Sequence, residues 1–494
     1  MSEHSVAYVA QREVPRVPAP RKETGFFGTL RKNLFATSLD SAITIALAIF
    51  VIWGVWRLVH WGIMTAVFTG DNREACLPTE AQPVVGACWA FVNAKFGQII
   101  YGLYPIDQRW RIDIVYALLA VLTVPMLIPS VPWKRLNAIL LFVVFPFVAL
   151  VLLTGGNFAV SGAWVGFLLA IAALASVLVA ASSVMPSERL LRVARWLAVV
   201  SIVVVFLNNI IPSGSFRLLG LSFTTLALIA TLLALGAVAA CVAAADTQAR
   251  KLYVLIPPAA VVALVVLLAA NFGLTEVPTH LWGGLLLTLV VALVGIVASL
   301  PLGILLALGR RSHLPAVRLL SIIFIEFWRG VPLITVLFMS TFMIPLLLPE
   351  GVTFNNLLRA LIGVALFTAA YLAEVVRGGL QAIPKGQFEG AQALGLSYWQ
   401  MMRLVIMPQA LKLVIPGIVN SFISMFKDTS LVYIIGLADL LGTVRRGFAD
   451  PNWITPTTAA TGLVFAGFLY WVFCFGMSRY SQFLERRFDT GYRR

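Results

Sequence analysis

The sequence AEVVRGGLQAIPKGQFEGAQALGLSYWQMMRLVIMPQALKLVIPGIVNSFISMFKDTS runs from Ala373 to Ser430 and has long apolar segments on both sides. Its middle, from Lys385 to Lys412, is polar enough to leave a lipid bilayer and rich in residues that favour helices. A helical hairpin of this kind between two membrane spans predicts a surface that contacts another protein. An amphipathic loop that lies on the membrane surface is the alternative.

The rest of the chain is strongly hydrophobic. Of its 494 residues, 60% are hydrophobic and 12% are charged, and the mean hydropathy is +0.94. This composition is typical of a protein that consists mostly of membrane spans. The formal charge of +15 is scattered over short loops and forms no basic face, which argues against nucleic-acid binding.

Apolar segments long enough to cross a hydrocarbon core of about 30 Å recur along the chain. We therefore expect an all-α polytopic membrane protein with about twelve transmembrane helices. The expected spans are 41–66, 111–131, 136–155, 162–184, 193–212, 221–244, 252–273, 280–308, 318–348, 357–379, 411–441 and 457–482.

The distribution of Lys and Arg predicts the topology. Basic residues fall in alternate loops, whereas the opposite loops, such as 155–161 and 271–279, carry almost none. The long loop 67–110 and the pair Arg445 and Arg446 do not follow this pattern. With an even number of spans, we expect both termini in the cytoplasm.

Composition also divides the chain. Residues 1–38 are basic and contain several prolines, which predicts a disordered cytoplasmic tail, and residues 488–494 form a second tail. The seven spans expected in 39–275 are plain runs of Ala, Val and Leu. The five spans expected in 276–487 carry Pro, Gly and charged residues, with the polar hairpin at 381–412.

The cysteines and histidines suggest no metal site. Cys76 and Cys88 share one polar loop and form a disulfide if that loop lies outside the cytoplasm; otherwise they remain thiols. The four histidines are far apart, and no CxxC is present. No Gly-Lys dipeptide occurs, so the chain has no P-loop for ATP, and GxSxG and HExxH are also absent.

Glu389, Ala391, Gly395 and Pro408 are spaced as in the EAA loop of bacterial ABC-importer permeases, which the hairpin resembles. That pattern is Glu-Ala-Ala, three residues, Gly, nine residues and Ile-x-Leu-Pro. Three positions depart from it with small or apolar residues, namely Gly390, Val405 and Met407.

The flanking segments resemble the permeases of polar amino acid uptake, of the histidine/glutamine type. The resemblance rests on EFWRGVPLI, AEVVRGGLQAIPKGQFEGAQALG and MPQALKLVIPGIVNSFISMFKDTSLVYIIG, and covers about residues 280–487. The long additional N-terminal region is similar to the long permease subunit of the general L-amino-acid transporter.

This resemblance implies a bacterial inner-membrane subunit whose last five spans form a type I importer core. The EAA loop would dock on one of two separate ATP-binding cassette subunits, which bind the ATP, so that no cofactor belongs to this chain. A second permease, expected to be a different protein, and a periplasmic amino acid-binding protein complete the assembly. The main alternative is a secondary amino acid transporter driven by an ion gradient, and a further one is a scaffold protein.

Two pairs of charged residues lie within or beside spans. Glu326 and Arg329 are three residues apart, ahead of Pro332. A charge at mid-membrane costs about 2.5–3.5 kcal/mol, so it is either paired or lines a wet path. We keep both possibilities: a broken helix beside the substrate pathway, or a structural ion pair. For Glu374 and Arg377, also three apart, the spacing favours structural pairing.

A polar cluster, Lys427-Asp428-Thr429-Ser430, interrupts an apolar stretch. An amino acid presents a carboxylate, which Lys427 would attract, and an ammonium, which Asp428 would attract. Thr429 and Ser430 would add hydrogen bonds. The alternative is that Lys427 and Asp428 neutralise each other or a partner subunit.

Overall fold

The computed structural model describes residues 26–488 apart from 81, 129, 157, 159–161, 183–187, 211–216, 219–220, 246 and 348–354. This part of the chain is all-α, with one antiparallel pair of two-residue strands, β1 Arg217–Leu218 and β2 Leu221–Ser222. Eleven of its helices are long and apolar enough to cross a membrane, or twelve if one bent pair counts as a span. The predicted fold class is confirmed.

The chain forms two compact units. The first combines the described residues up to Asn93 with Pro451–Thr461, and the second comprises Ala94–Asp450 and the described residues from Gly462. The boundary between these units does not lie near residue 275, where the sequence predicts that an accessory region ends and a permease core begins. That functional division stays a prediction.

The first unit contains α1 Phe26–Leu34, α2 Ser38–Val59 with its π-helical extension η1 His60–Met64, and η2 Arg73–Cys76. Thr37 caps α2 by accepting a hydrogen bond from the Asp40 backbone, and no residue of α2 is buried. Helix α1 lies inside the segment expected to be a disordered tail, where Phe26, Leu30 and Leu34 recur at helical spacing. The rest of that segment up to residue 25, and the C-terminal tail from 489, lie outside the described residues.

A disulfide joins Cys76 to Cys88 in this unit, with their Cα atoms 5.7 Å apart. The Cys88 backbone N–H donates to the Thr461 hydroxyl at 2.9 Å, and Phe91 packs against Trp453. The loop is thus tied to Pro451–Thr461, far along the chain.

Helices of the second unit before residue 276 fall into two groups. Helix α3, Trp89–Tyr101, continues into this unit from the first. The first group is η3 Ile106–Gln108, α4 Trp110–Leu127, α5 Lys134–Ile139, η4 Leu140–Val144 and α6 Phe145–Thr154; the second is α7 Gly162–Ser182, α8 Glu188–Ile210, α9 Phe223–Ala243 and α10 Gln248–Ala269.

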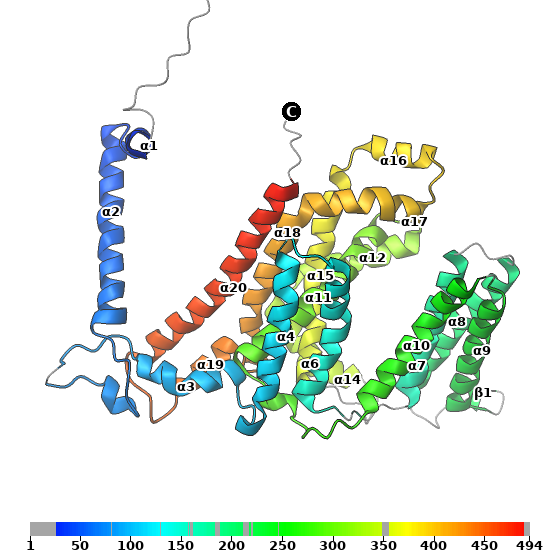
Figure 1. The fold of residues 1–494 in the computed structure, drawn as a ribbon, viewed down its shortest axis with the longest axis horizontal. Coiled ribbons are helices and arrows are strands. Elements are labelled where there is room, and N and C mark those ends of the chain that lie inside the picture. Colours follow the sequence, from blue (N-terminus) through cyan, green and yellow to red (C-terminus); the bar gives the residue numbers. More distant parts are fainter. Residues whose placement is uncertain are drawn as a thin grey trace, which may run out of the picture. The chain divides into compact units, whose positions relative to one another are not determined.

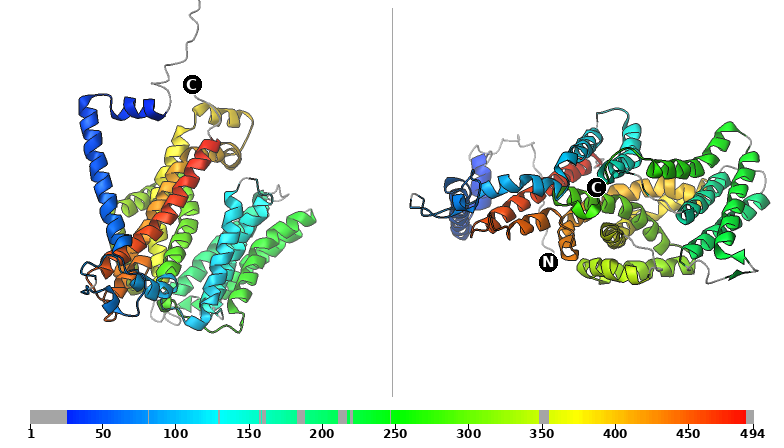
Figure 2. Two further views of the ribbon diagram at one scale, coloured as in Figure 1. Left: turned by 60° about the vertical axis from the view of Figure 1, so that its left-hand side comes forward. Right: turned by 90° about the horizontal axis from the view of Figure 1, so that it is seen from below.

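Helices α7 to α10 pack on one another as a bundle (Figures 1 and 2). Small side chains fill its centre, and the buried members include Ala173, Ala180, Ala194, Ala234 and Ala237. Small residues allow close helix approach in a membrane, where no hydrophobic force brings helices together.

The remaining elements form the C-terminal core: η5 Thr279–Leu281, α11 Gly284–Arg310, α12 Pro315–Gly330, α13 Leu333–Phe338, η6 Met339–Met343, α14 Ile344–Leu347, α15 Asn356–Ala382, α16 Lys385–Ala393, α17 Tyr398–Met401, η7 Met402–Ile406, α18 Met407–Asp428, η8 Thr429–Ile435, α19 Leu440–Gly447 and α20 Thr458–Phe488.

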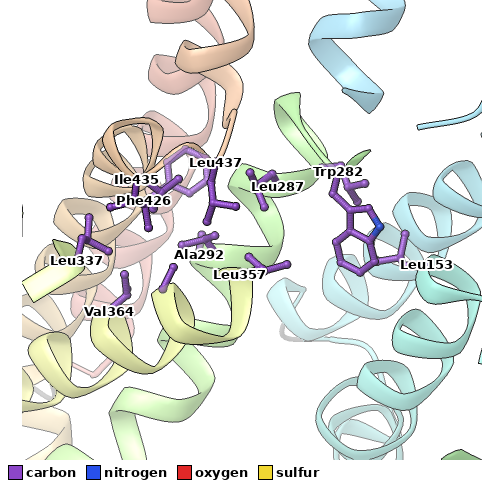
Figure 3. Packing of buried hydrophobic residues seen from close by; sticks show 14 of the residues in the cluster. Leu153, Trp282, Leu287, Ala292, Leu337, Leu357, Val364, Phe426, Ile435 and Leu437 are labelled. Atoms are coloured by element: carbon purple, nitrogen blue, oxygen red, sulfur yellow. The ribbon is translucent and has the colours of Figure 1, made fainter. Parts of the chain in front are cut away.

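Helices α11, α15 and α18 carry the main hydrophobic core (Figure 3). Gly303 permits close packing of α11 on α15, because a Cβ there would lie 2.8 Å from the Leu372 Cβ and 3.0 Å from the Ala369 carbonyl oxygen. Helices α4 and α6 join the same core, with Leu153 beside Trp282 in Figure 3. The buried Arg111 of α4 donates to the Thr275 carbonyl at 2.8 Å.

The span expected at 318–348 consists of two helices. The chain bends by 107° between helix α12 and helices α13–α14, and the break lies at Val331 and Pro332. Pro332 has no backbone N–H to continue the helix, and a residue before proline favours the extended conformation that Val331 adopts.

Candidate functional site

The predicted hairpin lies at one end of the C-terminal core (Figure 1). Helix α16 ends in a turn where Gly395 adopts a φ of +72°, a conformation that costs other residues about 1–2 kcal/mol. The Leu396 backbone N–H donates to the Ala391 carbonyl at 3.2 Å, and that of Gly395 to the Gln392 carbonyl at 2.9 Å. This hydrogen bonding closes the helix end as a glycine-terminated cap.

The second half of the hairpin differs from expectation. Ser397 starts α17 with a capping box that includes Gln400. From Tyr398 the helical run continues through the π-helical turn η7 and α18 to Ile435 without a loop. The sequence suggested two short helices, but only α16 is a separate short helix.

The apolar residues of the hairpin face two ways. Ala391, Met402 and Ile406 are buried in a cluster with Leu380 and Ile383, beneath the hairpin. The outward side is what we call the docking patch; it consists of Leu394, Tyr398, Trp399 and Leu404, with exposed fractions of 79%, 42%, 67% and 64%. The apolar residues of the hairpin therefore do not form a single surface.

The other EAA-like positions frame this patch. Glu389, Gly390 and Pro408 are exposed, while Ala391 faces the cluster below. A Cβ at Gly390 would meet no atom within 4 Å, so helix packing does not require glycine there. Pro408 lies in the first turn of α18, directly after η7.

Polar contacts fix the hairpin to the membrane helices. The Gln409 side chain donates to Gln387 at 3.0 Å, which ties α18 to α16. Arg311, at the end of α11, donates to the Leu380 carbonyl at 2.9 Å and lies 5.6 Å from the centre of the Phe388 ring. The hairpin is thus held to the ends of both α11 and α15.

Below the hairpin, three arginines surround one carboxylate. Glu374 of α15 accepts from Arg377 and from Arg310, each at 2.6 Å, and its carboxylate lies 3.8 Å from the guanidinium of Arg329. The Glu374 side chain is only 15% exposed. The pairing with Arg377 follows the predicted spacing, but Arg310 comes from 64 residues earlier and no spacing rule suggested it. We call these four residues the Glu374 cluster.

Glu326 and Arg329 do not pair with each other, although they lie on one helix. Glu326 contacts Arg310 at 2.9 Å and is 54% exposed, whereas Arg329 approaches Glu374. Glu326 connects α12 to Arg310 of α11, and Arg329 connects α12 to Glu374 of α15. This supports the structural alternative for them more directly than it supports a place beside the pathway.

The polar cluster after α18 is divided by the core. Phe426 points into the core (Figure 3), which leaves Lys427 exposed and Asp428 half-buried. Thr429 is buried, and its hydroxyl donates to the Phe426 carbonyl at 2.8 Å. In the part of the chain that the structure describes, no ion pair joins Lys427 to Asp428, and Ser430 is half-buried.

Comparison with known proteins gives relatives over the whole length. The inner membrane amino-acid ABC transporter permease protein YhdY of Escherichia coli K12 is 40% identical over 97% of each chain. This chain belongs to the amino-acid ABC transporter permeases. A second relative, the glutamate/glutamine/aspartate/asparagine transport system permease protein BztC of Rhodobacter capsulatus, is 37% identical over 96% of each chain.

Other matches cover part of this permease. The family described as binding-protein-dependent transport system inner membrane component matches residues 299–490. The glutamate/aspartate import permease protein GltK of Escherichia coli O6:H1 is 34% identical over 42% of the permease and 93% of its own length. A crystal structure of an amino acid ABC transporter with histidines matches with a TM-score of 0.37 and 28% identity, over 41% of the permease and 92% of that chain.

Membership in this family has direct consequences. It makes the permease a multi-pass transport subunit, consistent with an inner-membrane location, and implies ATPase and binding-protein partners. It favours the ATP-driven importer over a secondary transporter.

Sequence reasoning missed a buried acid in the permease. Asp439 is fully buried, accepts from the Tyr470 hydroxyl at 2.8 Å and caps α19 through the backbone of Gly442 at 2.9 Å. Burial raises the pKa of Asp439, and the hydrogen bonds it accepts oppose that rise. An aspartate is a favoured N-cap residue, so Asp439 could have predicted the start of the short helix α19. Sequence analysis did not use it because the long apolar segments around it suggested a continuous membrane span.

Proposed function

We propose that this permease forms half of the membrane pathway of an ATP-driven importer of L-amino acids. Two ATP-binding cassette subunits bind the ATP, and the permease has no ATPase site of its own. A second, different permease subunit forms the other half, and a periplasmic binding protein delivers the substrate. The docking patch is the observation that supports this assembly best.

The patch has the properties of a protein interface. Its Tyr and Trp are residue types enriched at interface hot spots, and its apolar side chains surround the Gly395 turn on the outside of the hairpin. Exposed charges, Glu389 and Arg403, lie next to it along the chain, as expected for a polar rim. We assign this surface to an ATPase subunit rather than to lipid headgroups.

Asp428 and Lys427 are our candidates for contact with the amino acid. Buried charges are normally paired, yet Asp428 is half-buried and, among the described residues, forms no ion pair. Residues that break such a local rule often serve a function. The ammonium of an incoming substrate would supply the missing positive partner, and Ser430 would add a hydrogen bond. Thr429 already bonds within the helix.

The proposed orientation puts the docking patch and both termini in the cytoplasm. The Cys76–Cys88 disulfide supports an oxidising compartment for the opposite loop. Peptide mapping of the membrane-inserted chain, without reductant and with free thiols blocked, is expected to recover the two cysteine peptides linked. Blocked, unlinked cysteines would remove this support.

The decisive experiment is a pull-down of the tagged permease in mild detergent, with identification of co-purifying subunits and an ATPase assay. We expect an ATPase subunit to accompany the wild-type chain. Gly395→Arg should lose this subunit and abolish uptake, because it combines a strained φ with a bulky charge beside the docking patch. Membrane insertion should be unchanged.

Gly395→Asn provides the matched control, because Asn tolerates the left-handed conformation and adds little bulk. It should retain the ATPase subunit and most of the uptake. Retention of the ATPase subunit by Gly395→Arg would contradict the docking role. Uptake by the permease alone, in energised vesicles without ATP, would instead support the secondary transporter.

A further inference from the structure

A basic cleft opens where α11 turns into α12, and it shares one residue, Arg310, with the Glu374 cluster. The cleft has a volume of about 710 Å³, and its lining includes Arg310, Arg311, His313, Arg318, Leu319 and Ile322. Three of these residues are arginines, and no acidic side chain is among them. The lining therefore favours an anion.

The arginines of the cleft differ in what they already bind. Arg310 is neutralised by Glu374 and Glu326, and Arg311 donates to the Leu380 carbonyl. Arg318 is exposed and, among the described residues, has neither an ion pair nor a side-chain hydrogen bond. The charge available to a ligand thus centres on Arg318, with Arg311 and His313 beside it.

The cleft combines this charge with an apolar border. Leu319 and Ile322 form part of its lining, and Leu314, Leu319 and Leu320 are 64%, 59% and 68% exposed. The first turn of α12 also lies at the cleft, and no side chain caps it, so its backbone N–H groups favour an anion as well. A ligand with a phosphate head and hydrocarbon chains would contact the arginines with its phosphate and the apolar border with its chains.

We propose that this cleft binds the headgroup of an anionic phospholipid. The phosphate would lie against Arg318 and Arg311, and the acyl chains would run along the exposed leucines of α12. Helix α11 is a candidate membrane span that ends at Arg310, and Arg310 lines the cleft. The cleft therefore lies at the level of the bilayer surface. Basic pockets at the ends of membrane helices are suited to such headgroups.

Native mass spectrometry of the full-length permease in mild detergent would test this site. The probes are phosphatidylglycerol, zwitterionic phosphatidylcholine and inorganic phosphate, added separately and in competition. We expect phosphatidylglycerol to bind more tightly than phosphatidylcholine. Arg318→Gln should weaken phosphatidylglycerol roughly five-fold, the effect of one basic residue near a lipid surface, and Arg318→Lys should retain most of the affinity.

Arg189→Gln is the matched control, since Arg189 is also an exposed arginine near the start of a span, in α8. It should bind the lipid like the wild type, and all variants should elute and melt alike. Equal affinity of Arg318→Gln and wild type for phosphatidylglycerol would overturn the proposal. Displacement of the lipid by millimolar inorganic phosphate would also overturn it, because the cleft would then be a site for free anions.

Discussion

The Glu374 cluster and the pair Lys427 and Asp428 both place charged residues within apolar sequence, but the structure pairs the charges of the first and leaves those of the second without an ion pair to each other. The Glu374 cluster is closed: three guanidinium groups surround one carboxylate that is 15% exposed. Lys427 and Asp428 are open: one is exposed, the other is half-buried, and no ion pair joins them in the described part of the chain.

This difference favours a structural role for the Glu374 cluster and a substrate-binding role for Asp428. The Glu374 cluster joins α11, α12 and α15, so its charges are satisfied by neighbours and hold the helices in place. Among the described residues no side chain of opposite charge forms an ion pair with Asp428, which is the basis for its proposed contact with the substrate. Substitutions at both groups would test this division between structural and substrate-binding residues.

The largest effect is expected at Glu374. Glu374→Gln would leave Arg377 and Arg329 without a carboxylate and Arg310 with Glu326 alone, and the loss of one partner from a mostly buried ion pair costs about 3–5 kcal/mol. Thermal unfolding in detergent should show a clear drop in melting temperature, and uptake should fall with the amount of folded protein. Glu326→Gln is the control: this half-exposed carboxylate should cost less than about 1 kcal/mol.

Asp428→Asn should have the opposite signature. Loss of a charged hydrogen bond to the substrate ammonium costs about 1.5–3 kcal/mol, equivalent to roughly ten-fold or more in the uptake KM. Thermal stability should stay at the wild-type value or rise, since a half-buried charge without an ion pair is removed. A change in protein yield alone, with normal KM, would move Asp428 to the structural group.

Arg377 and Arg329 sharpen the comparison within the closed cluster. Arg377 contacts Glu374 through two nitrogens, at 2.9 and 2.6 Å, whereas Arg329 stays 3.8 Å away. Arg377→Gln should therefore destabilise the permease by about 1–2 kcal/mol and Arg329→Gln by less than about 1 kcal/mol. If Arg329→Gln nevertheless impairs uptake of the stable protein, Arg329 belongs beside the pathway.

The smallest effect is expected for Thr429→Val, which preserves the shape of the side chain. It removes the hydrogen bond to the Phe426 carbonyl, worth about 1 kcal/mol, and a longer one that joins the Thr429 and Tyr470 hydroxyls at 3.4 Å. Substrate affinity should be unchanged, because the hydroxyl is buried and already bonded. An altered KM for any amino acid would show that Thr429 reaches the substrate after all.

Sequence reasoning found what depends on local pattern. Hydrophobic length predicted the spans, and a broken helix ahead of Pro332 was one of the two possibilities kept for the span that bends. The spacing of Gly395 and Pro408 located the hairpin and its turn. These features follow from residues that are close together in the chain.

Contacts between distant residues could not be predicted in this way. Arg310 and Glu374 are 64 positions apart, so no helical spacing relates them, and Glu326 was assigned to Arg329 rather than to Arg310. Which apolar residues of the hairpin are buried depends on their packing against Leu380 and Ile383, and the sequence does not give this packing. The disulfide was left open because its formation depends on the compartment.

The helical run from Tyr398 has a mechanical consequence. It contains both Trp399 of the docking patch and Asp428, and no loop separates them. At a rise of 1.5 Å per residue, about 45 Å of helix connect the two positions. The run is continuous but not straight, since in Figure 1 it crosses the end of the core from α17 and then turns along α18; the π-helical turn at Met402–Ile406 and Pro416 are features at which helices bend. A displacement of the docking patch would therefore reach Asp428 through unbroken helix, with bending concentrated at these two places.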